Sequence, residues 1–226
     1  MVLIEQLLTK DEVVQFRHKL YQAPWIDGKG TAMGMAADVK QNAQADANHS
    51  DIQTLSNLLL SKLGNSPQVV SAALPNRIFP PCFNRYSQGE TYGYHVDAAI
   101  MRMPNSHEVL RSDISMTTFL SEPDEYQGGE LIISTEFGEQ KVKLAAGDAV
   151  LYPSSSLHRV TPVTEGERLA AITWIQSLVS DSAMRDTLYQ LDQSIQTLVN
   201  NPAIRREELD RLHHVYHNLI RQHSQV

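Results

Sequence analysis

Apolar residues near the start of the chain recur at helical spacing. Val13, Phe16 and Leu20 lie three or four positions apart. They follow Thr9-Lys-Asp-Glu12, a sequence in which the first and last side chains can each bond the backbone of the other. This pattern predicts an amphipathic helix over residues 10–22.

Two further helices are expected before residue 75. The stripe that predicts the first consists of Ile52, Leu55, Leu59 and Leu63. We expect this helix to start near Ser50, with Ser50 or Asp51 as its cap, and to stop at Gly64. Ser66-Pro67 then favours the start of a short helix that ends before Pro75.

From about residue 77 the pattern changes to short apolar and β-branched runs separated by glycine-containing turns. These runs are Ile78–Tyr86, Tyr92–Asp97, Ile114–Leu120, Glu130–Ser134, Gln140–Leu144, Ala149–Tyr152, His158–Val163 and Arg168–Ser177. Such regular short strands predict a β-sandwich or barrel. Pro80 and Pro81 indicate that the first run is an edge strand or is bent.

The last part of the chain is helical again. Two apolar stripes, one running from Leu188 to Leu198 and one from Leu209 to Leu219, flank a break at Asn201-Pro202. They predict an antiparallel helical hairpin over residues 179–226. We therefore expect a mainly β protein with flanking helices: one domain over 1–178, helical to about residue 76 and β from about 77 to 178, followed by the hairpin.

Composition narrows the function. The chain has 226 residues, enough for one large domain, and a net charge of −7, which disfavours nucleic acid and anionic membranes as partners. It has no apolar run long enough to span a membrane and no secretory signal at its start. Cys82 is the only cysteine, which excludes an intrachain disulfide and a cysteine-rich zinc site. These features favour a cytoplasmic location.

Three side chains form a candidate metal site. His95 and Asp97 are two apart on an expected strand, so their side chains should share one face. His158 lies on a later strand that a jelly roll would bring beside them. Two histidines and one carboxylate are the ligands of non-haem Fe(II) oxygenases, which leave positions open for a co-substrate and O₂.

Arg168 lies at the start of the apolar strand that follows the Glu165-Gly166 turn. A guanidinium that points inward from such a strand needs an anionic partner. Its planar fork suits a carboxylate, and the distal carboxylate of 2-oxoglutarate is the obvious candidate.

Several other motifs have ordinary structural interpretations. His49-Ser-Asp51 repeats the His-x-Asp spacing, but it lies at an expected helix start. The cluster His213, His214 and His217 lacks an accompanying carboxylate motif and fits a solvated or interface helix face. We expect Cys82 to be a buried structural thiol. Tyr94 and Val96 should point into the core, opposite His95.

The joint motif set resembles that of the prolyl/lysyl hydroxylase-like Fe(II)/2-oxoglutarate dioxygenases. The matching stretches are Tyr86-x-x-Gly89-x-x-Tyr92-x-x-His95-x-Asp97, Gly128-Gly129-Glu130-Leu131, Gly147-Asp148-Ala-Val-Leu-Tyr152-Pro153, His158-Arg-Val-Thr-Pro-Val163 and Gly166-Glu-Arg168. Over its full length, including Trp25-x-Asp-Gly-x-Gly-Thr31 and the terminal helices, the chain resembles the bacterial PKHD-type hydroxylases, among them those described as iron-uptake factors.

The resemblance implies a double-stranded β-helix (jelly roll), with Fe(II) bound by His95, Asp97 and His158 and 2-oxoglutarate held by Arg168. It also implies L-ascorbate as a reductant, and it places Tyr86 where a family tyrosine reaches 2-oxoglutarate. For Tyr86, packing in the core is an equal alternative. The implied reaction uses O₂ to hydroxylate a C–H bond and releases succinate and CO₂.

The sequence leaves the substrate open between a small molecule and a peptidyl group. We expect the loop over 98–112 to be mobile and near the substrate mouth. A non-enzymatic metal or 2-oxoglutarate sensor, a cupin-like metalloprotein that does not use 2-oxoglutarate, and a nucleic-acid demethylase are the alternatives. The hairpin can pack on the barrel or on a second subunit, so a homo-oligomer also stays open.

Overall fold

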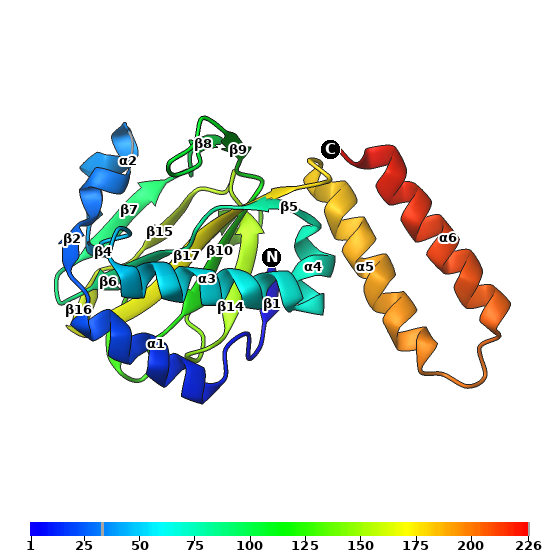
Figure 1. The fold of residues 1–226 in the computed structure, drawn as a ribbon, viewed down its shortest axis with the longest axis horizontal. Coiled ribbons are helices and arrows are strands. Elements are labelled where there is room, and N and C mark those ends of the chain that lie inside the picture. Colours follow the sequence, from blue (N-terminus) through cyan, green and yellow to red (C-terminus); the bar gives the residue numbers. More distant parts are fainter. Residues whose placement is uncertain (33, 226) are drawn as a thin grey trace.

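Two antiparallel sheets form the centre of the protein in the computed structural model, which describes residues 1–32 and 34–225 (Figure 1). The larger sheet has eight strands: β1 (Val2–Ile4), β14 (Ala149–Pro153), β10 (Ile114–Phe119), β17 (Arg168–Ser177), β6 (Cys82–Tyr86), β4 (Ala43–Ala45) and β2 (Trp25–Asp27) in that order, with β5 (Pro75–Ile78) beside β17. The smaller has five: β13 (Gly138–Val142), β12 (Leu131–Thr135), β15 (His158–Val160), β7 (Thr91–His95) and β3 (Lys40–Gln41). The expected jelly roll is confirmed.

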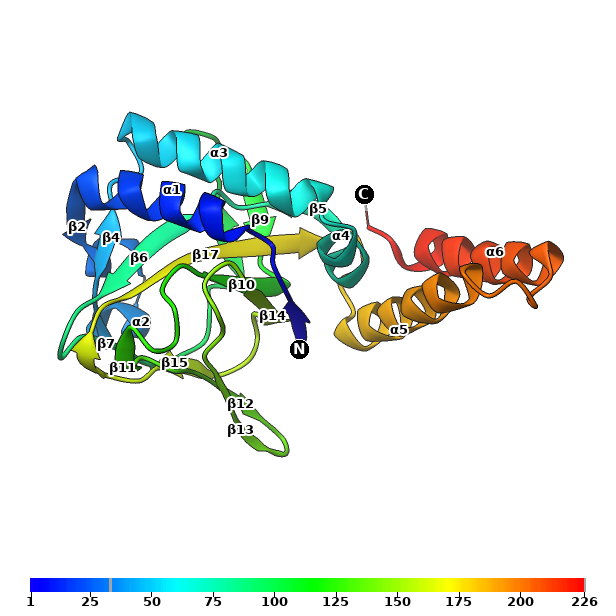
Figure 2. The same cartoon turned by 90° about the horizontal axis from the view of Figure 1, so that it is seen from below.

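Helices α1 (Lys10–Gln22) and α3 (Ser50–Asn65) lie together across the larger sheet (Figure 2). Their buried faces, which include Phe16 and Leu59, join residues of the sheet such as Phe83 and Met116 in one hydrophobic core. Because helices cover one face of this sheet and the smaller sheet covers the other, every residue of β10 is buried.

The helix predictions are confirmed with one correction. Thr9 and Glu12 form the capping box of α1, and the Ser66 hydroxyl accepts a bond from the Val69 N–H at the start of α4 (Pro67–Ala73). The cap of α3 is His49, whose Nδ1 accepts from the Asp51 N–H at 3.3 Å. The prediction of Ser50 or Asp51 was therefore wrong by one or two positions.

The proline pair divides the first expected strand. β5 and β6 are separate strands on either side of Pro80 and Pro81, because proline has no N–H to give to a ladder. β6 lies between β17 and β4 inside the larger sheet, whereas β5 pairs with β17 alone. Of the two alternatives, an edge strand or a bent one, the edge strand is wrong for β6, and the break at the prolines agrees with the bent strand. The expected strand over 158–163 likewise divides into β15 and β16 (Val163–Gly166), which pairs with β11 (Tyr126–Gly128).

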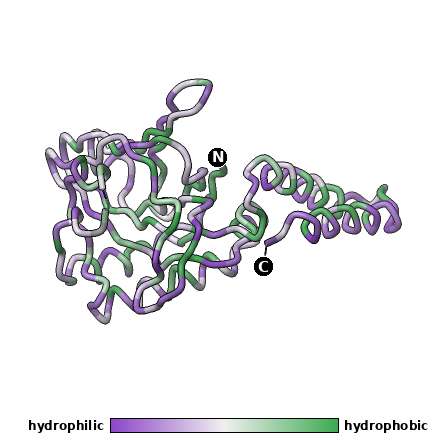
Figure 3. Tube along the Cα trace, turned by 90° about the horizontal axis from the view of Figure 1, so that it is seen from above, coloured by the Kyte–Doolittle hydropathy of each residue, from purple (hydrophilic) through white to green (hydrophobic). Residues whose placement is uncertain are grey.

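Helices α5 (Ser182–Val199) and α6 (Arg206–His223) form the expected hairpin and extend away from the two sheets (Figure 1). Leu188, Ile195 and Tyr216 form its core together with Leu74 and Val179 at the edge of the sheet domain. Hydrophilic and hydrophobic positions alternate along both helices (Figure 3). Within the described residues, no helix is long and apolar enough to cross a membrane.

The contact of α3 with the sheet can be tested with two adjacent leucines. Leu59 is completely buried, whereas Leu58 is 49% exposed. We expect Leu59→Ala to lower the free energy of unfolding by about 2–5 kcal/mol, because the substitution leaves a cavity in the core. The matched Leu58→Ala substitution should change it by less than about 0.5 kcal/mol. Urea denaturation of both variants measures the difference, and equal losses would contradict this account of the core.

Candidate metal centre

The pairing of β7 with β15 brings two distant histidines together. His95 ends β7, and its Cα is the ladder partner of the Cα of His158, the first residue of β15. The two imidazole centroids are 4.2 Å apart, and both side chains are buried. One strand pairing thus brings together two residues that are more than sixty positions apart in the sequence.

Asp97 completes the group from outside the strand. β7 ends at His95, so the prediction that His95 and Asp97 share a strand face was wrong. The carboxylate is positioned instead from the larger sheet: the Ser115 hydroxyl donates to Oδ2 at 2.5 Å, and Ser115 is bonded in turn to Ser154 at 2.7 Å. The Asp97 side chain is therefore held between the two sheets.

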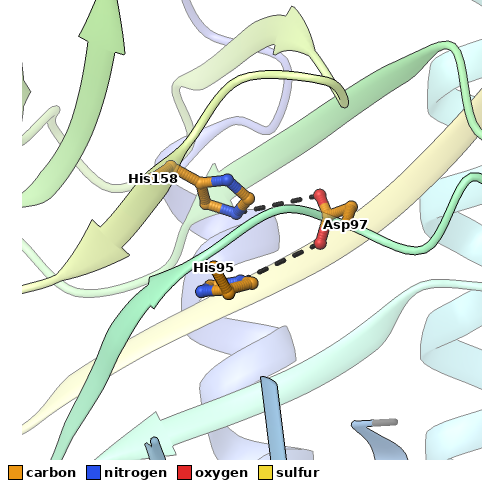
Figure 4. A group of neighbouring side chains, drawn as sticks. All are labelled: His95, Asp97 and His158. Atoms are coloured by element: carbon orange, nitrogen blue, oxygen red, sulfur yellow. Dashed lines mark ion pairs between the residues drawn. The ribbon is translucent and has the colours of Figure 1, made fainter. Parts of the chain in front are cut away.

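Both imidazoles direct their Nε2 atoms toward Asp97 (Figure 4). The Nδ1 atoms lie 2.8 Å from the Gly93 carbonyl oxygen and 2.9 Å from the Ser156 carbonyl oxygen. Each Nδ1 can therefore carry the proton and donate, which leaves the lone pair on each Nε2. Burial, with a smaller effect from His158, lowers the pKa of His95 to about 4, which favours the neutral ligand form.

The separations fit one shared ion. His95 Nε2 lies 3.9 Å from Asp97 Oδ1, and His158 Nε2 lies 3.7 Å from Asp97 Oδ2. Two donors bonded to one ion at about 2.1 Å can be at most about 4.2 Å apart. Among the described residues, these three form the one group of histidine, cysteine, aspartate or glutamate side chains with metal-ligand spacing. Two imidazoles and a carboxylate leave room for further ligands.

Arg168 supplies an uncompensated charge in the same cavity. Its Cα pairs with that of Tyr86 across β17 and β6, and the residue is 1% exposed. The guanidinium carbon lies 5.2 Å from the Tyr86 ring centre and 5.4 Å from that of Phe119. All three guanidinium nitrogens are buried without a hydrogen-bond partner. Such a charge costs several kcal/mol unless an anion pairs with it, so the site fits a carboxylate ligand.

A cavity of about 360 Å³ connects the three candidate metal ligands with Arg168. His95, Asp97, His158, Arg168 and Tyr86 all line it. Burial raises the pKa of Tyr86 to about 12, so this phenol stays protonated and can donate a hydrogen bond into the cavity. The cavity can therefore hold an anion that reaches from the Arg168 guanidinium toward the metal-ligand group.

Residues that flank the ligands behave differently from the prediction. The Tyr92 ring is stacked on His95 at a centroid distance of 3.6 Å. Tyr94 and Val96 were expected in the core, but they are 38% and 49% exposed. Tyr94 lies on the outer face of the smaller sheet beside Glu139 and Arg159, because no helix covers that face as α1 and α3 cover the larger sheet.

The segment over 98–112 is a β-hairpin, not an irregular loop. β8 (Ile100–Arg102) pairs with β9 (Val109–Arg111), and Met101 and Pro104 line the cavity. This segment therefore lies beside the cavity, and its place at the substrate mouth stays a prediction. Arg111 donates to Asp113 at 2.7 Å and is not among the residues that line the cavity.

The other histidines and the cysteine that the sequence singles out do not belong to the group of His95, Asp97 and His158. His213 and His217 stack on α6 with ring centres 6.2 Å apart. Cys82 is only partly buried as a residue, but burial of its thiol raises its pKa to about 11, as expected for an inert sulfur. Sequence patterns missed the cavity residues Lys40 and Gln44, because strands β3 and β4 are too short to show alternation. They also missed Asn84 and Ser115, which lie on expected strands but reach the site only through tertiary packing.

Comparison with known proteins agrees with this geometry. Residues 81–176 match the 2OG-Fe(II) oxygenase superfamily, and residues 182–225 match the PKHD-type hydroxylase C-terminal domain. The chain is 70% identical to a PKHD-type hydroxylase of Alteromonas mediterranea and 63% identical to one of Shewanella frigidimarina, each over all of both chains. The fold is similar to that of a Pseudomonas putida prolyl-4-hydroxylase, with a TM-score of 0.53, 19% identity, and coverage of 78% of this chain and 91% of the other.

The role of Ser115 in positioning Asp97 gives a prediction. Ser115→Ala removes the hydroxyl that orients the carboxylate, and we expect the dissociation constant for Co(II) to rise about 10- to 100-fold. Ser194→Ala, at an exposed position on α5, is the matched control and should leave that constant unchanged. Calorimetric titration of the metal-free protein measures both, and thermal melting tests whether the fold is kept. An unchanged Co(II) affinity in Ser115→Ala would contradict this role.

Proposed function

Because the chain belongs to the PKHD-type hydroxylases of the 2OG-Fe(II) oxygenase superfamily, we propose that His95, Asp97 and His158 bind Fe(II) and that Arg168 binds 2-oxoglutarate. The protein is an Fe(II)- and 2-oxoglutarate-dependent dioxygenase. The observation that carries the assignment of residues is the buried, unpartnered Arg168 guanidinium in the cavity that the three candidate ligands line. A cupin-like protein that does not use 2-oxoglutarate would have no need of this charge.

When bound, iron and 2-oxoglutarate supply the oxidation: O₂ is consumed, succinate and CO₂ are released, and a C–H bond of the substrate becomes C–OH. The chain's own residues supply the geometry. His95 and His158 present Nε2 because backbone carbonyls hold their Nδ1 atoms. Ser115 fixes the Asp97 carboxylate, so the ligand set is oriented before any ion arrives.

Arg168 and Tyr86 act on the co-substrate. The Arg168 fork pairs with the distal carboxylate, and the adjacent Tyr86 phenol can donate a further hydrogen bond to it. The rings of Tyr86 and Phe119 flank the guanidinium and exclude water, which strengthens the pairing. These contacts would hold 2-oxoglutarate in one orientation within the cavity.

The proposal extends to the reductant, the location, the domain boundaries and the substrate class. The resemblance supports L-ascorbate as a reductant, and the lone Cys82 supports a cytoplasmic location. We assign residues 1–178 to the dioxygenase unit and 179–226 to a helical appendage that can contact a second copy. The net charge of −7 favours a small-molecule or peptidyl substrate over nucleic acid.

The experiment that tests the assignment is an anaerobic titration of Fe(II) and 2-oxoglutarate, followed through the visible charge-transfer band of the chelate. We expect the band in the wild-type protein and its loss in His158→Ala, because a ligand is missing. Arg168→Ala should need about tenfold or more 2-oxoglutarate to reach the same band, since a buried charge pair is lost.

The control is Arg159→Ala. This arginine follows His158 in the sequence, but it lies against Tyr94 on the outer face of the smaller sheet. It should leave both the band and its 2-oxoglutarate requirement unchanged. A folded wild-type protein that binds iron but gives no band would contradict the proposal. A normal 2-oxoglutarate requirement in Arg168→Ala would remove Arg168 from it.

A further inference from the structure

Lys40 brings a second buried cation to the cavity. It forms β3 with Gln41, and its Cα pairs with that of Tyr92 on β7. Its Nζ lies 5.3 Å from the centre of the Tyr92 ring, which in turn stacks on His95. The residue is only 7% exposed, yet it lines the cavity. The ammonium is therefore one aromatic ring away from a candidate metal ligand.

The charge balance of the cavity changes when the site is loaded. Burial lowers the pKa of Lys40, while the negative charges of nearby groups, Asp97 and Asp27 among them, oppose that shift. In the proposed function Asp97 is a metal ligand, so its charge is balanced by the ion. Both carboxylates of 2-oxoglutarate are also engaged, one by Arg168 and one at the metal. A substrate carboxylate in the cavity would add a negative charge near the buried Lys40 ammonium, and two opposite buried charges favour one another.

The other side chains that line the cavity suit a substrate whose carbon skeleton carries a carboxylate. Gln44 and Asn84, which are ladder partners across β4 and β6, line the cavity with uncharged side chains. Phe79 and Trp174 contribute an edge-to-face ring pair with centres 5.6 Å apart. Among the described lining residues Asp97 is the one carboxylate, so outside the group of His95, Asp97 and His158 the wall offers no negatively charged side chain to a cationic substrate.

Two segments near Lys40 in the sequence or in the cavity lining lie at one end of the sheets. Ala36 of α2 (Met35–Asp38) and Pro104 of the β8–β9 hairpin line the cavity, and Figure 1 shows both segments at the same end of the sheets. Lys40 follows α2 within two residues. An incoming substrate would meet a positive side chain inside a protein whose net charge is −7.

We propose that Lys40 is the specificity residue for a substrate that presents a carboxylate, and that the enzyme hydroxylates an acid in preference to an amine. The inference rests on the proposed function, because it assigns the second cation of the same site. The carboxylate can belong to a free organic acid or to an acidic side chain of a peptide. Lys40 pairs with it and so directs the adjacent carbon chain toward the metal ligands.

The test uses protein loaded with Mn(II) and 2-oxoglutarate without oxygen. The probes are carboxylic acids, each matched to the carboxamide and the amine of the same skeleton, together with end-blocked dipeptides that contain Glu, Gln or Lys. Binding is measured by thermal shift and by ligand-observed NMR. We expect acids to bind at least about tenfold more tightly than the matched amides and amines. The free acids and the Glu peptides distinguish the two sources of the carboxylate.

Three variants make the test specific. Lys40→Met keeps the length of the chain without the charge and should weaken acid binding about tenfold or more, whereas Lys40→Arg should retain most of it. Lys141→Met removes an exposed lysine of β13 and should leave acid binding unchanged. Preference for amines or amides, absence of any acid that binds, or acid binding that persists in Lys40→Met would each overturn the inference.

The charge-transfer titration separates this inference from the proposed function. Absence of the band in the wild-type protein would refute the proposed function. A normal band together with failure of the acid probes would refute the Lys40 inference alone. A Lys40→Met variant that needs as much extra 2-oxoglutarate as Arg168→Ala would assign Lys40 to the co-substrate and would also overturn the inference.

Discussion

The antiparallel pairing of β7 with β15 is the constraint on which the rest of the site depends. It places His158 opposite His95 and so creates, from two remote segments, a pair of imidazoles with their Nε2 atoms on the same carboxylate. Side chains on a strand alternate between faces, so a slip of one residue would turn one of the two histidines to the outer face of the smaller sheet. The larger sheet contributes the third member of the group, because Ser115 of β10 bonds the Asp97 carboxylate.

The distribution of charge explains how an acidic protein can bind an acid. Arg168 and Lys40 are buried cations in one cavity, whereas the excess of negative charge lies elsewhere on the chain. Arg168 lies between aromatic rings with no hydrogen-bond partner, an arrangement that is unfavourable until an anion enters. The buried Arg168 charge therefore lowers the stability of the ligand-free protein, and binding of an anion offsets this loss.

Much of this could be predicted from the sequence, because the determining signals are local or periodic. The capping box of Thr9 and Glu12 located α1, and the spacing of His95, Asp97, His158 and Arg168 singled out residues that the fold brings into one cavity. The failures have physical causes. The exposed positions of Tyr94 and Val96 depend on which sheet face the helices leave uncovered, and strand alternation alone does not encode that. Lys40 and Ser115 have roles that arise only from tertiary contacts.

The central claim is that one cavity holds the metal at His95, Asp97 and His158 and the co-substrate at Arg168. A crystal structure of the protein grown anaerobically with Mn(II) and 2-oxoglutarate tests it most directly, because anomalous scattering locates the metal without assumptions. We predict a single anomalous peak bonded to the Nε2 atoms of both histidines and to the Asp97 carboxylate, with a 2-oxoglutarate carboxylate bonded to the Arg168 guanidinium. A metal bound elsewhere, or 2-oxoglutarate bound away from Arg168, would contradict the account.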